Sequence, residues 1–130
     1  MFTINEIKDA HSKVKSGADF PSLVQDLINL GVVYYDSYVI DGHKKYVGKD
    51  DYTIEGIAMY SDLDVAVDSN TEQFKHYLKI HQQGQTDYFT FCKNAAETGV
   101  EKWTVDTQKM TCTYYDKAGN KMLEEMIPQL

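Results

Sequence analysis

Four histidines and two cysteines give this sequence its main capacity for chemistry near neutral pH. His11 and His81 each fall on the apolar stripe of a predicted helix. Such a histidine is either a core residue held by one hydrogen bond, or an acid-base or ligand-binding group in a cleft. The sequence leaves both roles open, and we take His11 and His81 as candidate ligand-binding residues.

The other two histidines carry weaker signals. His43 follows the turn residues Asp41-Gly42 and is either a ligand-binding candidate or only a cap of that turn. His76 and His81 lie five residues apart, which is roughly 140° around a helix, so they cannot chelate one ion together. We therefore predict no metal site and no cofactor.

The cysteines are Cys92 and Cys112, which have no C-x-x-C spacing and form a poor zinc signature. Cys92 lies beside Phe91 and Ala95 on an apolar helical face, which favours an inert buried thiol. A nucleophilic pair of Cys92 with His11 or His81 remains open, provided that the fold brings the two side chains within hydrogen-bond reach.

Ten tyrosines are the main compositional excess. Five of them gather in the first half of the chain: Tyr34, Tyr35, Tyr38, Tyr46 and Tyr52. They either pack a sheet or form an aromatic, polar surface that binds a protein or a small ligand. Tyr35 and Tyr38 are our ligand-binding candidates among them.

Caps and glycines outline the helices that must position these side chains. Thr3-Ile4-Asn5-Glu6 has the spacing of a capping box and predicts a helix that ends at Gly17. Asp19 as a cap and Pro21 in the first turn predict a second helix, which ends at Gly31.

Strands follow at residues 32–40, 43–47 and 52–57, with a two-residue hairpin turn at Asp41-Gly42. Residues 58–70 then connect the two halves of the chain. Apolar and acidic residues alternate there from 62 to 68, which is consistent with a short strand and does not fit an EF-hand calcium loop.

The second half repeats this order. Asn70 caps a third helix that ends at Gly84, and Thr86 or Asp87 caps a fourth that ends at Gly99. Strands are predicted at residues 102–106, 109–115 and 121–127. The two halves align at an offset of 67 or 68 residues, through the pairs Gly17/Gly84, Asp19/Asp87 and Gly31/Gly99.

These patterns predict one α+β domain over residues 1–130, built from two ααβββ units at about 3–57 and 70–127. We expect an antiparallel sheet packed with four helices, since amphipathic helices must bury their apolar stripes. The matching offsets indicate an internal duplication, which would create a central cleft between the halves.

Charge limits the partners. The chain of 130 residues has 20 acidic and 13 basic side chains and a net charge of −7, so we expect no nucleic-acid partner.

The start of the chain lacks the apolar core of a signal peptide, and no segment approaches the roughly 20 apolar residues of a membrane span. We therefore expect a cytoplasmic protein with no membrane partner.

Four segments carry a resemblance to a known family: residues 41–43, 81–92, 99–103 and 110–116, including His81-Gln82-Gln83-Gly84 and Gly99-Val100-Glu101-Lys102-Trp103. They resemble the YbcV-like group of uncharacterised bacterial and prophage-borne proteins, a domain of unknown function sometimes labelled "phage envelope protein". The resemblance covers nearly the whole chain and implies no established activity. The sequence itself offers no membrane span, signal or basic arm in support of an envelope role.

The leading hypothesis is therefore a non-catalytic binding or accessory protein, with an unidentified protein or small molecule as partner and a homodimer left open. One alternative is a small enzyme whose cleft between the halves contains at least two of His11, His81 and Cys92 within about 4 Å or one water of each other. A second is an acidic regulator that mimics DNA and presents one continuous acidic face.

Overall fold

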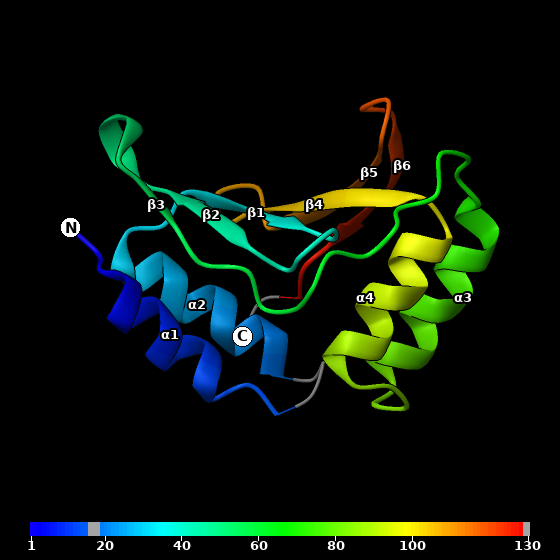
Figure 1. Cartoon of the computed structure of the whole chain (residues 1–130). Helices are drawn as coiled ribbons and strands as arrows, with labels where there is room; N and C mark the ends of the chain where they lie inside the picture. Colours follow the sequence, from blue (N-terminus) through cyan, green and yellow to red (C-terminus); the bar gives the residue numbers. More distant parts are fainter. Residues whose placement is uncertain (16–18, 129–130) are drawn as a thin grey trace.

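Four helices lie beneath one face of a six-stranded antiparallel sheet, and no helix among the described residues covers the opposite face (Figure 1). This computed structural model describes residues 1–15 and 19–128. Its elements are α1 Ile4–Ser12, α2 Phe20–Leu30, β1 Tyr34–Tyr38, β2 Lys44–Val47, the 3-10 turn η2 Lys49–Asp51, β3 Thr53–Glu55, α3 Thr71–Gln82, α4 Tyr88–Glu97, β4 Val100–Asp106, β5 Thr111–Asp116 and β6 Lys121–Met126. The predicted α+β class, with four helices and an antiparallel sheet, is confirmed.

Helix α1 begins at the predicted capping box. The Thr3 hydroxyl accepts a hydrogen bond from the Glu6 backbone N–H at 3.2 Å, and the Glu6 carboxylate accepts one from the Thr3 backbone N–H at 2.9 Å. Both bonds satisfy N–H groups that a helix start leaves without partners. The predicted end of this helix at Gly17 lies outside the described residues.

Helix α2 has Pro21 in its first turn and Gly31 at its end, as predicted. Gly31 adopts φ +99°, the left-handed conformation that glycine favours at a helix terminus. Asp19 occupies the predicted N-cap position of α2, but its side chain makes no capping hydrogen bond to the described residues of the helix. Its carboxylate accepts a hydrogen bond from the Lys15 backbone N–H at 2.8 Å.

The connection between β1 and β2 is longer than predicted. Val39 is fully buried, and its N–H donates to the Glu101 carbonyl at 3.0 Å. Gly42 adopts φ +77°, and its N–H donates to the Tyr38 carbonyl at 2.9 Å. The prediction of a two-residue turn at Asp41-Gly42 is therefore wrong. Val39 bonds to β4 instead of continuing the β1–β2 pairing, so the loop spans residues 39–43.

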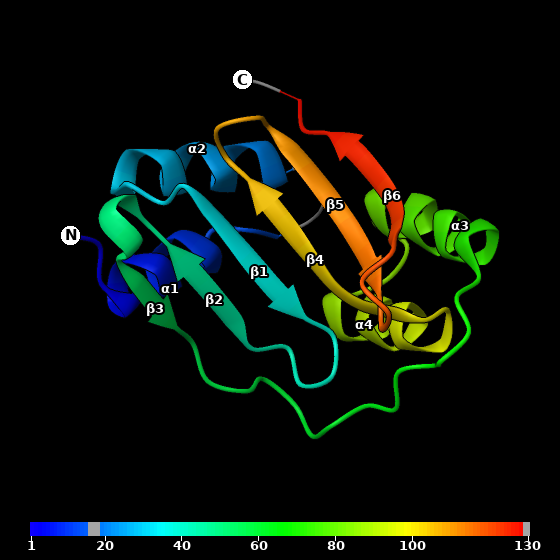
Figure 2. The same ribbon diagram turned by 90° about the horizontal axis from the view of Figure 1, so that it is seen from above.

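The linker between the halves, residues 56–70, contains no strand, so the short strand expected there is wrong. Its backbone makes single hydrogen bonds to different partners: Leu63 N–H donates to the Ile40 carbonyl at 2.7 Å, and Ala66 N–H donates to the Ala96 carbonyl at 2.9 Å. Val67 is 79% exposed, so the apolar residues do not share one buried face. Figure 2 shows the linker passing around the hairpin end of the sheet.

The helices of the second half begin at their predicted caps. The Asn70 side chain accepts a hydrogen bond from the Gln73 N–H at 3.1 Å at the start of α3. At the start of α4, the Asp87 carboxylate accepts one from the Thr90 N–H at 2.7 Å, so Asp87 is the cap of this helix.

The sheet has the strand order β3-β2-β1-β4-β5-β6, so the central pair joins the two halves (Figure 2). In that pair Asp36 lies opposite Thr104, and Ser37 lies opposite Trp103. Side chains alternate between the two faces of a strand. Ser37 and Trp103 therefore face the helices, and Asp36 and Thr104 face the uncovered side.

The core fills the space between the sheet and the helices. Phe74 of α3 is fully buried, with its ring centre 4.8 Å from that of Tyr114 and 5.9 Å from that of Phe91. Val24 and Leu27 of α2 are also fully buried. Each half thus contributes helices to one continuous core, which fixes the sheet above it.

Candidate functional site

Lys44 is the most unusual side chain on the helix-covered face of the sheet. It lies opposite Ser37 in the β1–β2 pair, and it shares this face with the buried Tyr46 two residues later. Its ammonium donates to the Tyr88 hydroxyl at 2.9 Å and lies 4.9 Å from the centre of that ring. No carboxylate of the described residues lies within 4.0 Å of this ammonium.

The environment of Lys44 disfavours its charge. Burial lowers the pKa of Lys44 from 10.5 to about 8, while the nearby Cys92 thiol acts weakly in the opposite direction. A buried ammonium is stable only when other groups compensate for the lost water. Here one neutral hydroxyl, one aromatic ring and the Met59 sulfur at 3.7 Å do so, and none of them carries a negative charge.

We call this region, where β2 of the first half meets α4 of the second, the seam site; it consists of Ser37, Lys44, Tyr60, Tyr88 and Cys92. The Tyr88 hydroxyl also lies 3.3 Å from the Ser37 hydroxyl. Cys92 follows Tyr88 by one helical turn on α4, and its thiol interacts with the hydroxyls of Tyr60 and Tyr88. Tyr88 thus contacts the Lys44 amine directly, Ser37 and Cys92 contact Tyr88, and Tyr60 contacts Cys92.

The thiol of the seam site is not activated. Burial raises the pKa of Cys92, and the Tyr60 hydroxyl and the Lys44 charge offset this only in part. Burial likewise raises the pKa of Tyr88, so its hydroxyl stays neutral. At pH 7 the site therefore contains a protonated thiol, neutral hydroxyls and one amine that can lose its proton.

His11 of α1 packs against the same face of the sheet and is half-buried. Its Nε2 hydrogen bonds to the Tyr46 hydroxyl at 2.7 Å, and its ring centre lies 6.3 Å from that of the buried Tyr35. Burial lowers the pKa of His11 from 6.5 to about 4, and the Lys44 charge adds to this effect. His11 is thus a neutral imidazole that supports Tyr46 from below.

The rim of the seam site is apolar and partly open to solvent. The Met59 sulfur lies 3.7 Å from the Lys44 ammonium, and this side chain is 62% exposed. Phe89 is 43% exposed, with its ring centre 5.1 Å from that of Tyr60. An exposed apolar surface therefore borders a poorly compensated cation.

The predicted site residues divide among three places. His11, Tyr35 and Cys92 lie on the helix-covered face, but no hydrogen bond within the described residues joins any two of His11, His81 and Cys92. His81 stacks on Phe91 with a centre distance of 4.3 Å, and its Nδ1 lies 3.0 Å from the Thr86 hydroxyl. His81 thus holds the turn between α3 and α4.

His43 and Tyr38 lie at the hairpin end of the sheet. Their rings stack with centres 4.4 Å apart and planes 7° apart. The Asp41 carboxylate accepts a hydrogen bond from the His43 backbone N–H at 3.0 Å and also contacts the imidazole. These contacts show His43 stabilising the loop that precedes β2.

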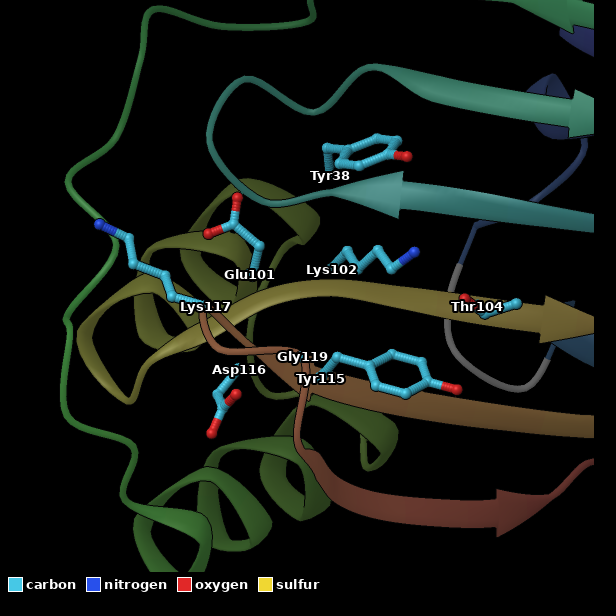
Figure 3. Close-up of a pocket in the computed structure, with 8 residues that line it drawn as sticks. All are labelled: Tyr38, Glu101, Lys102, Thr104, Tyr115, Asp116, Lys117 and Gly119. Atoms are coloured by element: carbon cyan, nitrogen blue, oxygen red, sulfur yellow. The ribbon is translucent and has the colours of Figure 1, made fainter.

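A shallow groove of about 420 Å³ crosses the uncovered face of the sheet (Figure 3). Lys102 lies on its floor between Tyr38 and Tyr115, 5.9 and 5.6 Å from the two ring centres. The Lys102 ammonium is also 3.8 Å from the Asp36 carboxylate. Because this cation already has a carboxylate and two rings, the groove is a weaker candidate site than the seam.

The five tyrosines, for which the sequence left both sheet packing and a binding surface open, are divided between both faces. Tyr35 and Tyr46 are 2% and 3% exposed and pack in the core, as the first alternative requires. Tyr38 lines the groove of the uncovered face. This division follows from strand alternation, because Tyr35 and Tyr38 are three residues apart on one strand.

Metal-binding groups and membrane-spanning helices are both absent from the described part of the chain. No three His, Cys, Asp or Glu side chains there lie close enough to hold a metal ion. The helices over the same residues are too short and too polar for any of them to cross a membrane.

Lys44 and Tyr88 were absent from the predicted site residues, although the sequence contained a signal for one of them. Within β2, Tyr46 belongs to the core, so strand alternation places Lys44 on the same face. No local pattern pairs Lys44 with Tyr88, because the two residues are 44 positions apart. They come into contact because β1 of the first half pairs with β4 of the second.

Residues 8–126 match the family described as "Protein of unknown function (DUF1398)". Since the match covers most of the chain, the protein belongs to this family. No similar protein is found among curated proteins. The resemblance to a domain of unknown function is thus confirmed; the match carries neither the YbcV-like name nor the envelope label, and it assigns no activity.

Proposed function

We propose that this member of the DUF1398 family is a binding protein whose seam site takes a small molecule with an anionic headgroup and an apolar body. One observation carries the proposal: the Lys44 ammonium lies on the covered face of the sheet with a hydroxyl, rather than a carboxylate of the described residues, as its hydrogen-bond partner. An anionic group would complete the shell of this cation.

The hydroxyls of the seam site suit such a headgroup. Ser37 and Tyr88 each carry an O–H that can rotate to donate to a carboxylate or a phosphate. Together with the Lys44 ammonium, which donates to the Tyr88 hydroxyl, they form a chain of three donors in which Ser37 is the most buried residue. Hydrogen bonds to a charged group contribute about 1.5–3 kcal/mol each, more than those between neutral groups.

The apolar body of the ligand would lie on the rim. Met59 and Phe89 expose apolar surface next to the headgroup donors. Burying such surface contributes roughly 25 cal/mol per Å². A ligand that is charged at one end and apolar at the other therefore matches both parts of the site, whereas a fully polar anion matches only one.

A matched series of eight-carbon ligands tests this proposal. We expect octanoate to raise the unfolding temperature and to give a binding isotherm by titration calorimetry, and octylammonium and octanol to do neither. Lys44→Met should abolish octanoate binding. Lys45→Met is the control, because Lys45 is the neighbouring residue of β2 and lies opposite Asp36, on the other face of the sheet.

Two results would overturn the proposal. One is equal binding of octanoate to the native protein and to Lys44→Met. The other is equal binding of octanoate and octylammonium to the native protein, since that would show apolar binding without recognition of the anion.

The uncovered face does not favour the DNA-mimic alternative. Lys45 lies between Asp36 and Glu55 in adjacent strands there, and Lys102 lies beside Asp36. A mimic requires one continuous acidic face, and these lysines interrupt it. The binding proposal therefore has more support than the regulator that mimics DNA.

We also propose that the two halves arose by duplication of one ααβββ unit. Asp36 and Thr104 are 68 residues apart and lie opposite each other in the central strand pair, where an axis relating the halves would pass. Gly31 and Gly99, also 68 apart, both adopt positive φ. Superposition of Cα atoms 19–47 on 87–115 should give a better fit than neighbouring offsets, and a worse fit would count against duplication.

The cytoplasmic location remains part of the proposal. Its support is the pair of free, buried thiols Cys92 and Cys112, which suits a reducing compartment. Cell fractionation would test it, and recovery of the protein from an oxidising compartment would contradict it.

A further inference from the structure

We propose that Lys44 is a carbonyl-reactive amine, which condenses with a small aldehyde or ketone held in the seam site to form an imine. This inference rests on the proposed function, because it uses the same site. It adds an activity to binding: a covalent, reversible bond between the protein and its ligand.

The position of Lys44 carries the inference. An amine reacts with a carbonyl carbon only when it has lost its proton and can be reached. The Lys44 amine lies beside the partly exposed Met59 and is not paired with a carboxylate of the described residues, which would otherwise hold its proton. Lys102, with Asp36 at 3.8 Å, shows the contrasting arrangement in the same sheet.

Tyr88 supplies the second group that the reaction needs. The amine nitrogen adds to the carbonyl carbon, a C–N bond forms, and the carbonyl oxygen takes up the proton that the nitrogen loses. The resulting carbinolamine then expels its hydroxyl as water, which requires a proton donor. The neutral Tyr88 hydroxyl, 2.9 Å from the Lys44 nitrogen, can donate that proton and regain it from the nitrogen as the C=N bond forms.

The groups around Lys44 keep it reactive. His11 on α1 is neutral near pH 7, Cys92 and Tyr88 on α4 remain protonated, and Tyr60 on the linker is a neutral hydroxyl with a raised pKa. Among these groups only Cys92 acts to keep the proton on Lys44, and burial outweighs it. With a pKa of about 8, the free-amine fraction of Lys44 at pH 7 exceeds that of an ordinary lysine by about 300-fold.

Reductive trapping of octanal by the native protein tests the inference. Cyanoborohydride delivers hydride to the imine carbon and leaves a secondary amine, so peptide mass spectrometry locates the modified lysine. The chain has 13 basic residues, all of them lysines, so the other twelve are internal controls in the same molecule. At pH 7 we expect Lys44 to be modified at least about tenfold faster than any other lysine, given its larger free-amine fraction.

Two further measurements separate chemistry from binding. At saturating octanal, where weaker binding no longer limits the rate, Tyr88→Phe should slow trapping at Lys44 by about 100-fold, the lower end of general acid-base effects. Excess octanoate should protect Lys44 and no other lysine. Modification spread over the exposed lysines, or an unmodified Lys44 in a protein that binds octanoate, would overturn the inference and leave the proposed function standing; failure of octanoate to bind would overturn the proposed function.

Discussion

Replacing Lys44 by Met should stabilise the protein at pH 7, because the ammonium is held where its charge is disfavoured. The pKa of Lys44 falls from 10.5 in the unfolded chain to about 8 in the folded one. At about 1.4 kcal/mol per pH unit, keeping the proton on Lys44 costs the folded state at most about 3 kcal/mol. Met has a similar length and no charge. The substitution also removes the hydrogen bond from Lys44 to Tyr88, which lowers the free energy of unfolding by about 1 kcal/mol. We expect a net gain of about 1–2 kcal/mol.

The pH dependence gives this prediction its specific signature. Between pH 8 and 10.5 the folded protein has released the Lys44 proton and the unfolded chain has not, so the stability of the native protein rises with pH. The other titrating groups are common to the native protein and Lys44→Met. The free energy of unfolding, measured by urea denaturation, should therefore change between pH 7 and 10.5 by about 3 kcal/mol in favour of the native protein relative to Lys44→Met.

Lys45→Met is the matched control for this series, since Lys45 lies on the opposite face of the same strand. Lys45→Met should show no gain in stability at pH 7, because Lys45 lies between Asp36 and Glu55 in the adjacent strands. A difference for Lys44→Met that does not change with pH would refute the reasoning, as would a loss of more than about 1 kcal/mol at pH 7.

Three further predictions concern the elements around the site. Burial lowers the pKa of His11 from 6.5 to about 4, so below pH 6.5 the unfolded chain gains a proton that the folded state excludes. The free energy of unfolding should therefore fall by up to about 3 kcal/mol as the pH drops from 6.5 to 4. Urea titrations should show this fall removed in His11→Gln and kept in the exposed His76→Gln. Gly99→Ala should cost about 1–3 kcal/mol more than Gly84→Ala in thermal unfolding, because both glycines have positive φ but only the Gly99 Cβ would meet the linker backbone, at 2.8 Å; equal losses would contradict the clash. Asp87→Ala removes the cap of α4 and should cost about 1 kcal/mol, and an unchanged denaturation midpoint would contradict that role.

Local rules were sufficient to predict the helices. The capping box at Thr3, the side-chain cap at Asn70 and the glycine end at Gly31 involve residues within one helical turn of each other. Such contacts depend on sequence spacing alone. Burial of the apolar stripes predicted that the helices pack on an antiparallel sheet. It predicted neither the strand order nor the placement of all four helices on one face.

The loops and the site depended on contacts that spacing does not reveal. The hairpin loop is long because Val39 pairs with Glu101 of the other half, and the linker lacks a strand because Leu63 and Ala66 bond to different elements. The Lys44–Tyr88 contact likewise joins the two halves. Alternation along β2 could have placed Lys44 on the covered face, but its partner required the three-dimensional arrangement of β1 and β4.

The ionisation of Lys44 is the central claim, and an NMR pH titration of the lysine side chains tests it most directly. With 13C-labelled lysine, the assignment of Lys44 follows from the signal missing in Lys44→Met. We predict that this signal titrates near pH 8 and moves to a higher pH when octanoate is added, because an anion stabilises the ammonium. If the Lys44 signal titrates near 10.4 like an ordinary lysine, or is unmoved by octanoate, the seam is a packed junction between the halves and not a binding site.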